Sequence, residues 1–290
     1  MKIWTALVAA SLVLAAATAG AASLSPEMAA MDRPVAPFRL SDEIYYVGAS
    51  DVTSFLIVTD DGLILTDGGF EDTAHQIEAN IKTLGFDIHK VKILMNGHAH
   101  FDHAGGLAEL KKASGATFVA SAADAPVLES GGVKDFVDLG PGTKFPPIKP
   151  DRILTDGEKL TLGHTTLTIH LTPGHTRGCT SWTMTAHIGG VPHDVLYICS
   201  LSVLSMYSLV KAPSYPGIAD DFAHSIATLK SLPCEIMLAS HGQFFGLTDK
   251  HAKLDAGDKN AFVDPASCKR YLDTAEQRYN AEIAKEKAAP

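Results

Sequence analysis

The sequence contains no cluster of basic residues, no C-x-x-C pair and no G-x-S-x-G motif. Its 24 Lys and Arg residues are outnumbered by 33 Asp and Glu residues, which gives a net charge of −9. Because no segment can neutralise a run of phosphates, we expect no nucleic-acid partner. The motifs of cysteine-based structural zinc sites and of hydrolases with a serine nucleophile are also missing.

Cysteine is scarce, with four residues in a chain of 290. A chain of this length buries a sizeable core without a dense disulfide framework. Hydrophobic residues make up 46% and charged residues 20% of the sequence, which is ordinary for a globular protein. This composition excludes a disordered chain, a collagen and a coiled-coil rod.

The first 22 residues have the pattern of a secretory signal peptide. Lys2 precedes an apolar stretch that is shorter than the roughly 20 residues needed to span a bilayer, and small residues matching A-x-A follow. We expect a signal peptide over residues 1–21 and a single domain over 22–290. The stretch contains no Cys for a lipid anchor, and no later run is apolar enough to cross a membrane. The mature protein is predicted to be periplasmic, with no membrane attachment.

Export to an oxidising compartment allows the four cysteines to form disulfides. Cys179, Cys199, Cys234 and Cys268 allow three pairings. We expect one bridge in each region of the chain, Cys234 with Cys268 in the C-terminal part and Cys179 with Cys199 across a predicted hairpin. For the second pair, two buried free thiols are an alternative.

The first half of the chain predicts alternating strands and helices. Residues 43–67 contain β-branched and aromatic runs with an Asp-Asp-Gly hairpin signal. A helix is expected over 71–85 and a buried strand over 91–95, followed by a helix from about 105 to 112 and a strand over 116–120.

The second half is expected to repeat this pattern, with a long loop before it. Residues 130–150 contain four Gly and four Pro, and a loop of this length is usually functional or mobile. The later expected elements are strands at 152–154, 159–162 and 165–171, a hairpin across 180–199, a helix over 220–232, a strand over 235–239 and a helix over 267–287. Two such halves suggest an α/β fold in which two sheets form a sandwich with helices outside.

The segment Asn96 to Gly106, NGHAHFDHAGG, carries the chemistry. It places His98, His100, Asp102 and His103 directly after the predicted strand at 91–95. Imidazole and carboxylate are good zinc ligands, and four of them within six residues would otherwise be a costly group of desolvated polar side chains.

Two further histidines follow later apolar runs, His175 in TPGHT and His241 in ASHGQ. Most of the other histidines are expected at the surface or hydrogen-bonded in the core. His170 lies close to His175 in sequence, and a supporting role beside the metal is the alternative for it.

The motif His98-Ala99-His100-Phe101-Asp102-His103 resembles the H-x-H-x-D-H signature of the metallo-β-lactamase superfamily. The resemblance extends from about residue 40 to the end and includes the T-D-G-G turn at Thr66 to Gly69. It implies a four-layer αββα sandwich of two mixed β-sheets flanked by helices. It also implies two Zn²⁺ ions per chain, the first held by three histidines and the second by an aspartate and two histidines. The first set is His98, His100 and His175, and the second is Asp102, His103 and His241.

The residue after the hairpin discriminates within the superfamily. Many relatives have a bridging Asp there, and the first two β-lactamase subclasses have a Cys, whereas this chain has Ser200. A Ser is similar to the third subclass of metallo-β-lactamases. Cys199 directly precedes it, and a shift of one residue would make that Cys a metal ligand instead.

The resemblance implies a zinc-dependent β-lactamase of the third subclass, in which a water shared by two zinc ions opens the β-lactam amide. Asp102 would hold the second zinc and orient the water, while Ser200 and Ser202 are candidates for binding the substrate carboxylate. The partner would be a small-molecule β-lactam, and we expect a monomer. The alternative is an exported thioester or lactone hydrolase on the same dizinc scaffold.

Overall fold

The computed structural model describes residues 24–289. The predicted signal peptide over residues 1–21 lies outside this range. Among the helices of the described chain, none is both long enough and apolar enough to cross a membrane.

The first sheet has seven strands, which lie side by side in the order of the sequence. Neighbours from β1 to β4 are antiparallel, and neighbours from β4 to β7 are parallel. The strands are β1 (Phe38–Arg39), β2 (Ile44–Tyr46), β3 (Phe55–Thr59), β4 (Gly62–Thr66), β5 (Val91–Met95), β6 (Thr117–Ser121) and β7 (Arg152–Leu154).

The second sheet has five strands in the order β12-β11-β10-β9-β8. Its only parallel pair joins β11 to β12, as expected when a helix connects them. The strands are β8 (Lys159–Leu162), β9 (Thr165–Leu171), β10 (Thr180–Ile188), β11 (Val191–Ile198) and β12 (Ile236–Ala239).

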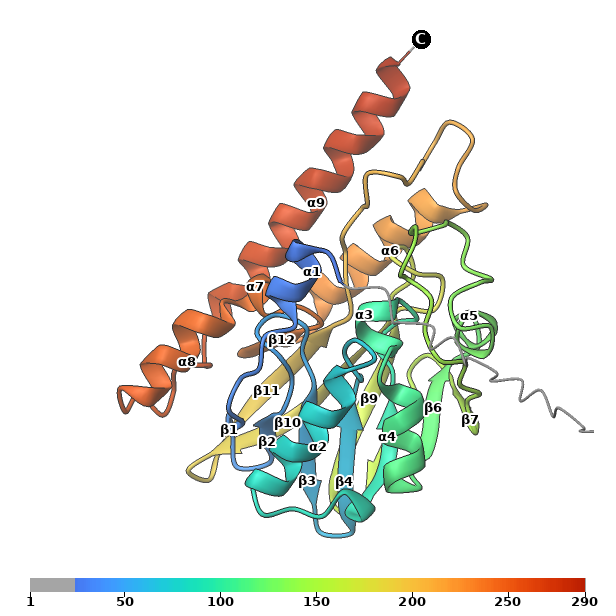
Figure 1. Cartoon of the computed structure of the whole chain (residues 1–290). Helices are drawn as coiled ribbons and strands as arrows, with labels where there is room; N and C mark the ends of the chain where they lie inside the picture. The colour runs from blue at the N-terminus through green and yellow to red at the C-terminus, as the bar shows by residue number, and fades with distance from the viewer. Residues whose placement is uncertain (1–23, 290) are drawn as a thin grey trace, which may run out of the picture.

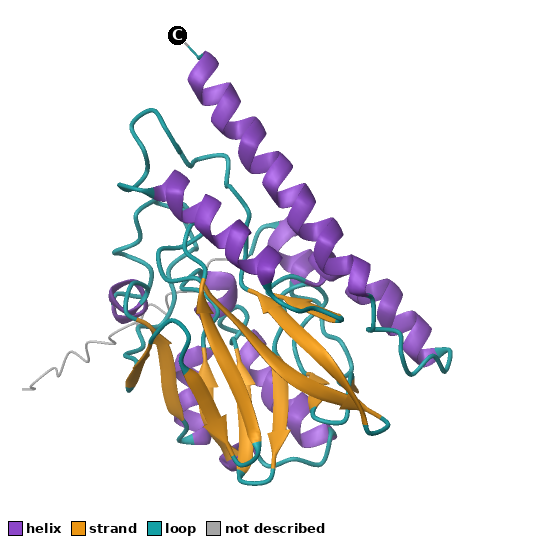
Figure 2. Ribbon diagram, turned by 180° about the vertical axis from the view of Figure 1, so that it is seen from behind, coloured by secondary structure: helices purple, strands orange, loops and turns teal. Residues whose placement is uncertain are grey.

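Helices cover the outer faces of both sheets (Figure 1). On the first sheet lie α2 (Thr73–Thr83) and α4 (Leu107–Ser114), and on the second lie α6 (Ile218–Ser231) and α9 (Pro265–Ala288). Figure 2 shows the sheets from behind, with α9 extending past the body of the fold. The shorter helices are α1 (Pro26–Met31), the 3-10 helix η1 (Ile88–Lys90), α3 (Phe101–Ala104), α5 (Ala125–Glu129), α7 (Gly242–Phe245) and α8 (Leu247–Asp255).

The main core fills the space between the two sheets. Trp182 of β10 stacks on Tyr197 of β11 with ring centroids 5.1 Å apart, and Phe55 of the facing sheet meets Tyr197 edge-on. All three side chains are fully buried. A second apolar layer lies between the first sheet and α2 and α4, with Ile77 and Leu110 at its centre. The expected αββα sandwich is therefore confirmed.

The strand at 152–154 is the main correction to the expected organisation. We expected it in the second half, but as β7 it pairs with β6 and ends the first sheet. The local sequence predicts that a segment forms a strand, but it does not predict which strand it pairs with, because pairing depends on contacts between distant segments. The helix expected over 105–112 is confirmed as α4, and a further four-residue helix, α3, precedes it at Phe101–Ala104.

A disulfide joins Cys234 to Cys268. It connects the segment before β12 to the first turn of α9, and its sequence separation is 34 residues. The bridge fastens the C-terminal helix to the second sheet, as expected from the sequence.

Candidate metal centre

The segment after β5 is held in place by the buried carboxylate of Asp67. One carboxylate oxygen accepts hydrogen bonds from the Asn96 side chain (3.0 Å) and the Gly97 amide (2.7 Å), and the other accepts one from the Tyr197 hydroxyl (2.6 Å). Only glycine fits at position 97, because a Cβ there would lie 2.6 Å from the hydroxyl oxygen of Tyr197. Asp67 itself has a φ of 57°, an uncommon backbone conformation for a residue other than glycine.

Three histidines converge beyond this segment. His98 and His100 come from the loop after β5, and His175 comes from the loop after β9. Their ring centroids lie 4.6 to 4.9 Å apart, and one ring nitrogen from each lies within 4.8 Å of the others. All three side chains are buried.

A second group lies beside the first and is formed by Asp102, His103 and His241. Nε2 of His103 lies 3.2 Å from Nε2 of His241, and Oδ2 of Asp102 lies 3.4 Å and 3.6 Å from these two nitrogens. Asp102 and His103 lie on α3, and His241 lies two residues after the end of β12 and directly before α7. The ring centroids of His98 and His103 are 4.2 Å apart, so the two groups adjoin.

Outer partners determine which ring nitrogen each histidine presents. Nδ1 of His241 lies 2.9 Å from Oδ2 of Asp51, and Nδ1 of His175 lies 2.8 Å from the carbonyl oxygen of Ser202. Both Nδ1 atoms therefore carry the proton, which leaves each Nε2 with a free lone pair. In His100 the nitrogen that faces a carboxylate is Nε2, which lies 3.5 Å from Oδ2 of Asp135 without a hydrogen bond, and this favours Nδ1 as the nitrogen for a metal.

Burial keeps the histidines of the first group neutral. It lowers the pKa of His98 and His175 well below the usual value and that of His100 to about 4, and neighbouring histidines lower the first two further. Burial alone would raise the pKa of Asp102, but nearby histidines, His103 above all, outweigh it and the pKa is lowered. The first group thus presents neutral imidazoles, and Asp102 of the second group presents an ionised carboxylate, the forms that bind metal.

These residues fit zinc. Zinc bonds to nitrogen and oxygen are about 2.0–2.2 Å long, so two ligand atoms of a tetrahedral site lie roughly 3.3 Å apart. The three distances of the second group, 3.2, 3.4 and 3.6 Å, are close to this value. In the first group, both ring nitrogens of His98 are buried without a hydrogen-bond partner in the described chain. A buried polar atom without a partner is costly, and a bound ion removes that cost.

Comparison with protein families supports the same conclusion. The family model of the metallo-beta-lactamase superfamily matches residues 47–241, which span both groups of ligand candidates. The chain belongs to the metallo-β-lactamase superfamily.

Solved structures of superfamily members resemble it over most of its length. The native FEZ-1 metallo-beta-lactamase from Legionella gormanii is 42% identical with a TM-score of 0.87, covering 89% of this chain and 99% of that one. The class B3 di-zinc metallo-beta-lactamase LRA-12 from an Alaskan soil metagenome is 33% identical with a TM-score of 0.83, covering 90% and 98%. The solved structures similar to this chain thus include class B3 enzymes.

Curated relatives are more distant. Hydroxyacylglutathione hydrolase of Rhodospirillum rubrum is 25% identical over 203 residues, which cover 69% of this chain and 61% of that protein. The match to this relative therefore spans about three fifths of the relative's length.

A second disulfide corrects the alternative in which Cys199 binds metal. Cys179 and Cys199 are bonded to each other, so neither has a thiolate to offer. Their sulfur atoms nevertheless lie within 4.8 Å of a ring nitrogen of His98. In this superfamily member the bridge therefore lies beside His98 and supplies no thiolate ligand.

Ser200 and Ser202 lie next to the site on the loop after β11. Ser200 is 2% exposed and its hydroxyl oxygen accepts a hydrogen bond from the Ser202 amide at 3.2 Å. Ser202 is partly exposed and its carbonyl holds His175. The role of both serines in substrate binding stays a prediction.

The Gly- and Pro-rich loop at 130–150 packs against the site. It brings Asp135 to His100, and its Phe136 ring lies 5.2 Å from that of Tyr207. The Tyr207 hydroxyl donates to the backbone carbonyl of His175 at 2.7 Å. This loop therefore supports two ligand candidates of the first group, which agrees with a functional role.

Sequence reasoning missed the carboxylates that hold the site together. Asp51 supports His241 and Asp135 supports His100, as described above. Asp124 accepts hydrogen bonds from the Ala99 amide, the Gly178 amide and the Thr176 hydroxyl, so it ties the two ligand loops to each other. Nothing in the local sequence of these three residues marks them, because each acts on a segment at least 25 residues away. His170 bonds Thr183 of the neighbouring strand and is not in the metal groups.

Proposed function

We propose that this chain is an exported zinc-dependent β-lactamase of class B3. The observation that carries the proposal is the triangle formed by Asp102, His103 and His241 beside the three-histidine group, on a chain whose solved relatives include class B3 enzymes. The function rests on the site, since the superfamily scaffold alone hosts several hydrolases.

Two zinc ions per chain would occupy the two groups. His98, His100 and His175 would hold the first, and Asp102, His103 and His241 the second. When bound, zinc supplies Lewis acidity and lowers the pKa of a coordinated water to near 7. No serine or cysteine nucleophile is then needed, which agrees with the missing G-x-S-x-G motif.

The side chains of the protein supply orientation. Asp102, which its histidine neighbours keep ionised, would hold the second metal and could accept a hydrogen bond from a water beside it. Asp51 and the Ser202 carbonyl fix the protons of His241 and His175 on Nδ1. Ser200 and Ser202 would bind the substrate carboxylate.

Periplasmic location and a monomeric state are part of this proposal. The N-terminal 22 residues support export through their composition, and two disulfides agree with an oxidising compartment. The partner would be a small β-lactam molecule, and the net charge of −9 favours no nucleic-acid partner.

A thioester or lactone hydrolase is the second candidate. It is favoured by the similarity to hydroxyacylglutathione hydrolase. Against it stands Ser200, at the position where those relatives would have a bridging carboxylate.

Hydrolysis of benzylpenicillin, S-lactoylglutathione and an acyl-homoserine lactone by the zinc-loaded mature protein distinguishes these candidates. We expect the kcat/KM for benzylpenicillin to exceed the other two. A larger kcat/KM for the thioester or the lactone would replace the proposed function by the alternative.

A further inference from the structure

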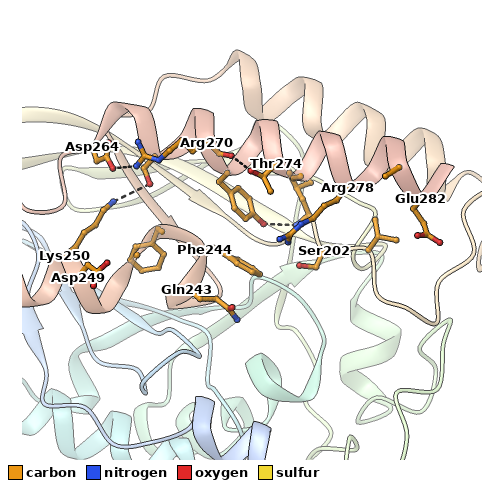
Figure 3. A pocket seen from close by; sticks show the side chains of 18 of the residues that line it. Ser202, Gln243, Phe244, Asp249, Lys250, Asp264, Arg270, Thr274, Arg278 and Glu282 are labelled. Carbon is orange, nitrogen blue, oxygen red and sulfur yellow. Dashed lines mark hydrogen bonds and ion pairs between the residues drawn. The ribbon is translucent and has the colours of Figure 1, made fainter. Parts of the chain in front are cut away.

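A cleft of about 950 Å³ lies beside the metal centre, between α9 on one side and α7 and α8 on the other (Figure 3). Ser202, whose carbonyl holds His175, lines one end. Gln243 and Phe244, which follow His241 in the chain, line its floor. Ser202 and Phe244 therefore border both this cleft and a metal group, since the Phe244 ring lies 5.2 Å from that of His241.

Lys250 is the unexplained residue of this cleft. Its side chain is only 7% exposed, and burial lowers its pKa to about 8. Its ammonium lies 3.5 Å from the Ser267 hydroxyl and 6.0 Å from the centre of the Phe245 ring. Within residues 24–289, Lys250 forms no ion pair; the charge of Asp264 opposes the lowering of its pKa, but Asp264 pairs with Arg270. A buried cation without an anionic partner is expensive unless a ligand supplies one.

Arg278 provides a second cation at the end of the cleft nearest the metal centre. In Figure 3 its side chain extends toward Ser202. Burial raises the pKa of Tyr271 and the charge of Arg278 opposes that rise, which places the guanidinium near this phenol. The Tyr271 hydroxyl accepts a hydrogen bond from the Leu201 amide, next to Ser202. No ion pair engages Arg278 in the part of the chain that the structure describes.

The charge of the cleft differs from that of the molecule. Its lining includes four cations against three carboxylates, whereas the whole chain has a net charge of −9. A positive cleft on an acidic protein concentrates anions at that place. The lining cations are Lys250, Lys253, Arg270 and Arg278, and the carboxylates are Asp249, Asp264 and Glu282.

We infer that this cleft is a substrate subsite for an anionic substituent, which pairs with Lys250 at the buried end while Arg278 pairs with the substrate carboxylate near Ser202. The inference rests on the proposed β-lactamase function and names the class of substrate that the site prefers. A cephalosporin suits this layout because its ring carboxylate and its C3 substituent are attached to neighbouring carbons.

Two cephalosporins test the subsite directly. Cefonicid carries a sulfonate on its C3 tetrazole, and cefamandole has the same skeleton with a methyl group in that place. In Lys250→Met, the ratio of kcat/KM for cefonicid to that for cefamandole should fall about tenfold, mainly through KM, because a charge-assisted contact is lost. Lys250→Arg should keep most of the ratio. Lys259→Met, which removes an exposed charge outside the cleft lining, is the matched control and should leave the ratio unchanged. An equal ratio in wild type and Lys250→Met would overturn the inference.

A labelling experiment tests anion binding in the cleft independently of catalysis. If neither cephalosporin is hydrolysed, the proposed function is contradicted, but the labelling result still shows whether the cleft binds anions. Pyridoxal phosphate and pyridoxal differ by a phosphate. The Lys250 amine adds to the aldehyde, water leaves, and borohydride reduces the imine to a stable secondary amine that peptide mass mapping locates. We expect Lys250 to be labelled faster by the phosphate form, and the advantage to shrink in Arg278→Gln. Equal labelling by both compounds, or no label on Lys250, would show that the cleft does not bind anions.

Discussion

The pairing of Asp51 with His241 allows a quantitative prediction about the second zinc. Oδ2 of Asp51 accepts from Nδ1 of His241 at 2.9 Å and from the Gln243 side-chain amide at 3.2 Å, while Oδ1 accepts from the Gln243 backbone amide at 2.8 Å. All three contacts need an acceptor. In Asp51→Asn, one of the two terminal atoms becomes an NH₂ group that faces a donor.

If that NH₂ group faces His241, the imidazole moves its proton to Nε2, the nitrogen that the metal requires. Replacing such a carboxylate partner typically costs 10- to 100-fold in metal affinity, about 1.4 to 2.8 kcal/mol. The first zinc should be affected far less, because His98, His100 and His175 do not contact Asp51. Equilibrium competition with a chromophoric chelator measures both affinities.

The matched control is Asp60→Asn, which breaks a similar but exposed pair between Asp60 in the β3–β4 turn and His164 in the β8–β9 turn. It should leave both zinc affinities unchanged. Wild-type affinity of both sites in Asp51→Asn would refute the assignment of His241 as a ligand supported by Asp51.

Three further predictions follow from other parts of the structure. Ser200→Ala should keep two zinc ions per chain and reduce kcat/KM by roughly 10- to 150-fold at most, because it removes a hydrogen bond to a charged group; loss of one zinc would make Ser200 a ligand. In metal-free protein, the pKa of His100 is lowered, so the unfolded state binds more protons than the folded state below pH 6.5. The unfolding free energy should therefore decrease as the pH is lowered from 6.5. Between pH 7 and pH 5, wild type should lose about 2 kcal/mol more unfolding free energy in urea than His100→Gln, and equal losses would contradict the burial of a neutral imidazole. Replacing both Cys234 and Cys268 by Ser should lower the unfolding free energy by roughly 3–4 kcal/mol, since the bridge closes a 34-residue loop; an unchanged urea midpoint would show that the bridge adds no stability.

The sequence predicted the parts of the fold that have a local signal. The apolar run at 91–95 is β5 and the long polar segment at 267–287 lies within α9, because periodicity and length decide such elements. The edge position of β7 could not be predicted, since it depends on pairing with β6. The short helices α7 and α8 were also missed, because four to nine residues carry too weak a helical pattern.

The ligand candidates could be predicted from the sequence because they too have a local signal. His98, His100, Asp102 and His103 lie within six residues, and their density is itself a signal. The supporting residues Asp51 and Asp135 have no such signal, because each meets its histidine only after the chain has folded. An isolated antiparallel bridge between Val52 and His241 brings Asp51, the residue before Val52, next to His241 in the folded chain. A sequence can thus reveal the ligand candidates of a metal site and leave their supporting contacts hidden.

The central claim is that this chain hydrolyses β-lactams with zinc held by the two adjoining groups. Its most direct test strips the mature protein with a chelator and titrates zinc back while recording benzylpenicillin hydrolysis and bound metal together. The account predicts no hydrolysis in the metal-free protein and recovery as bound zinc approaches two per chain. Full activity without metal would contradict it.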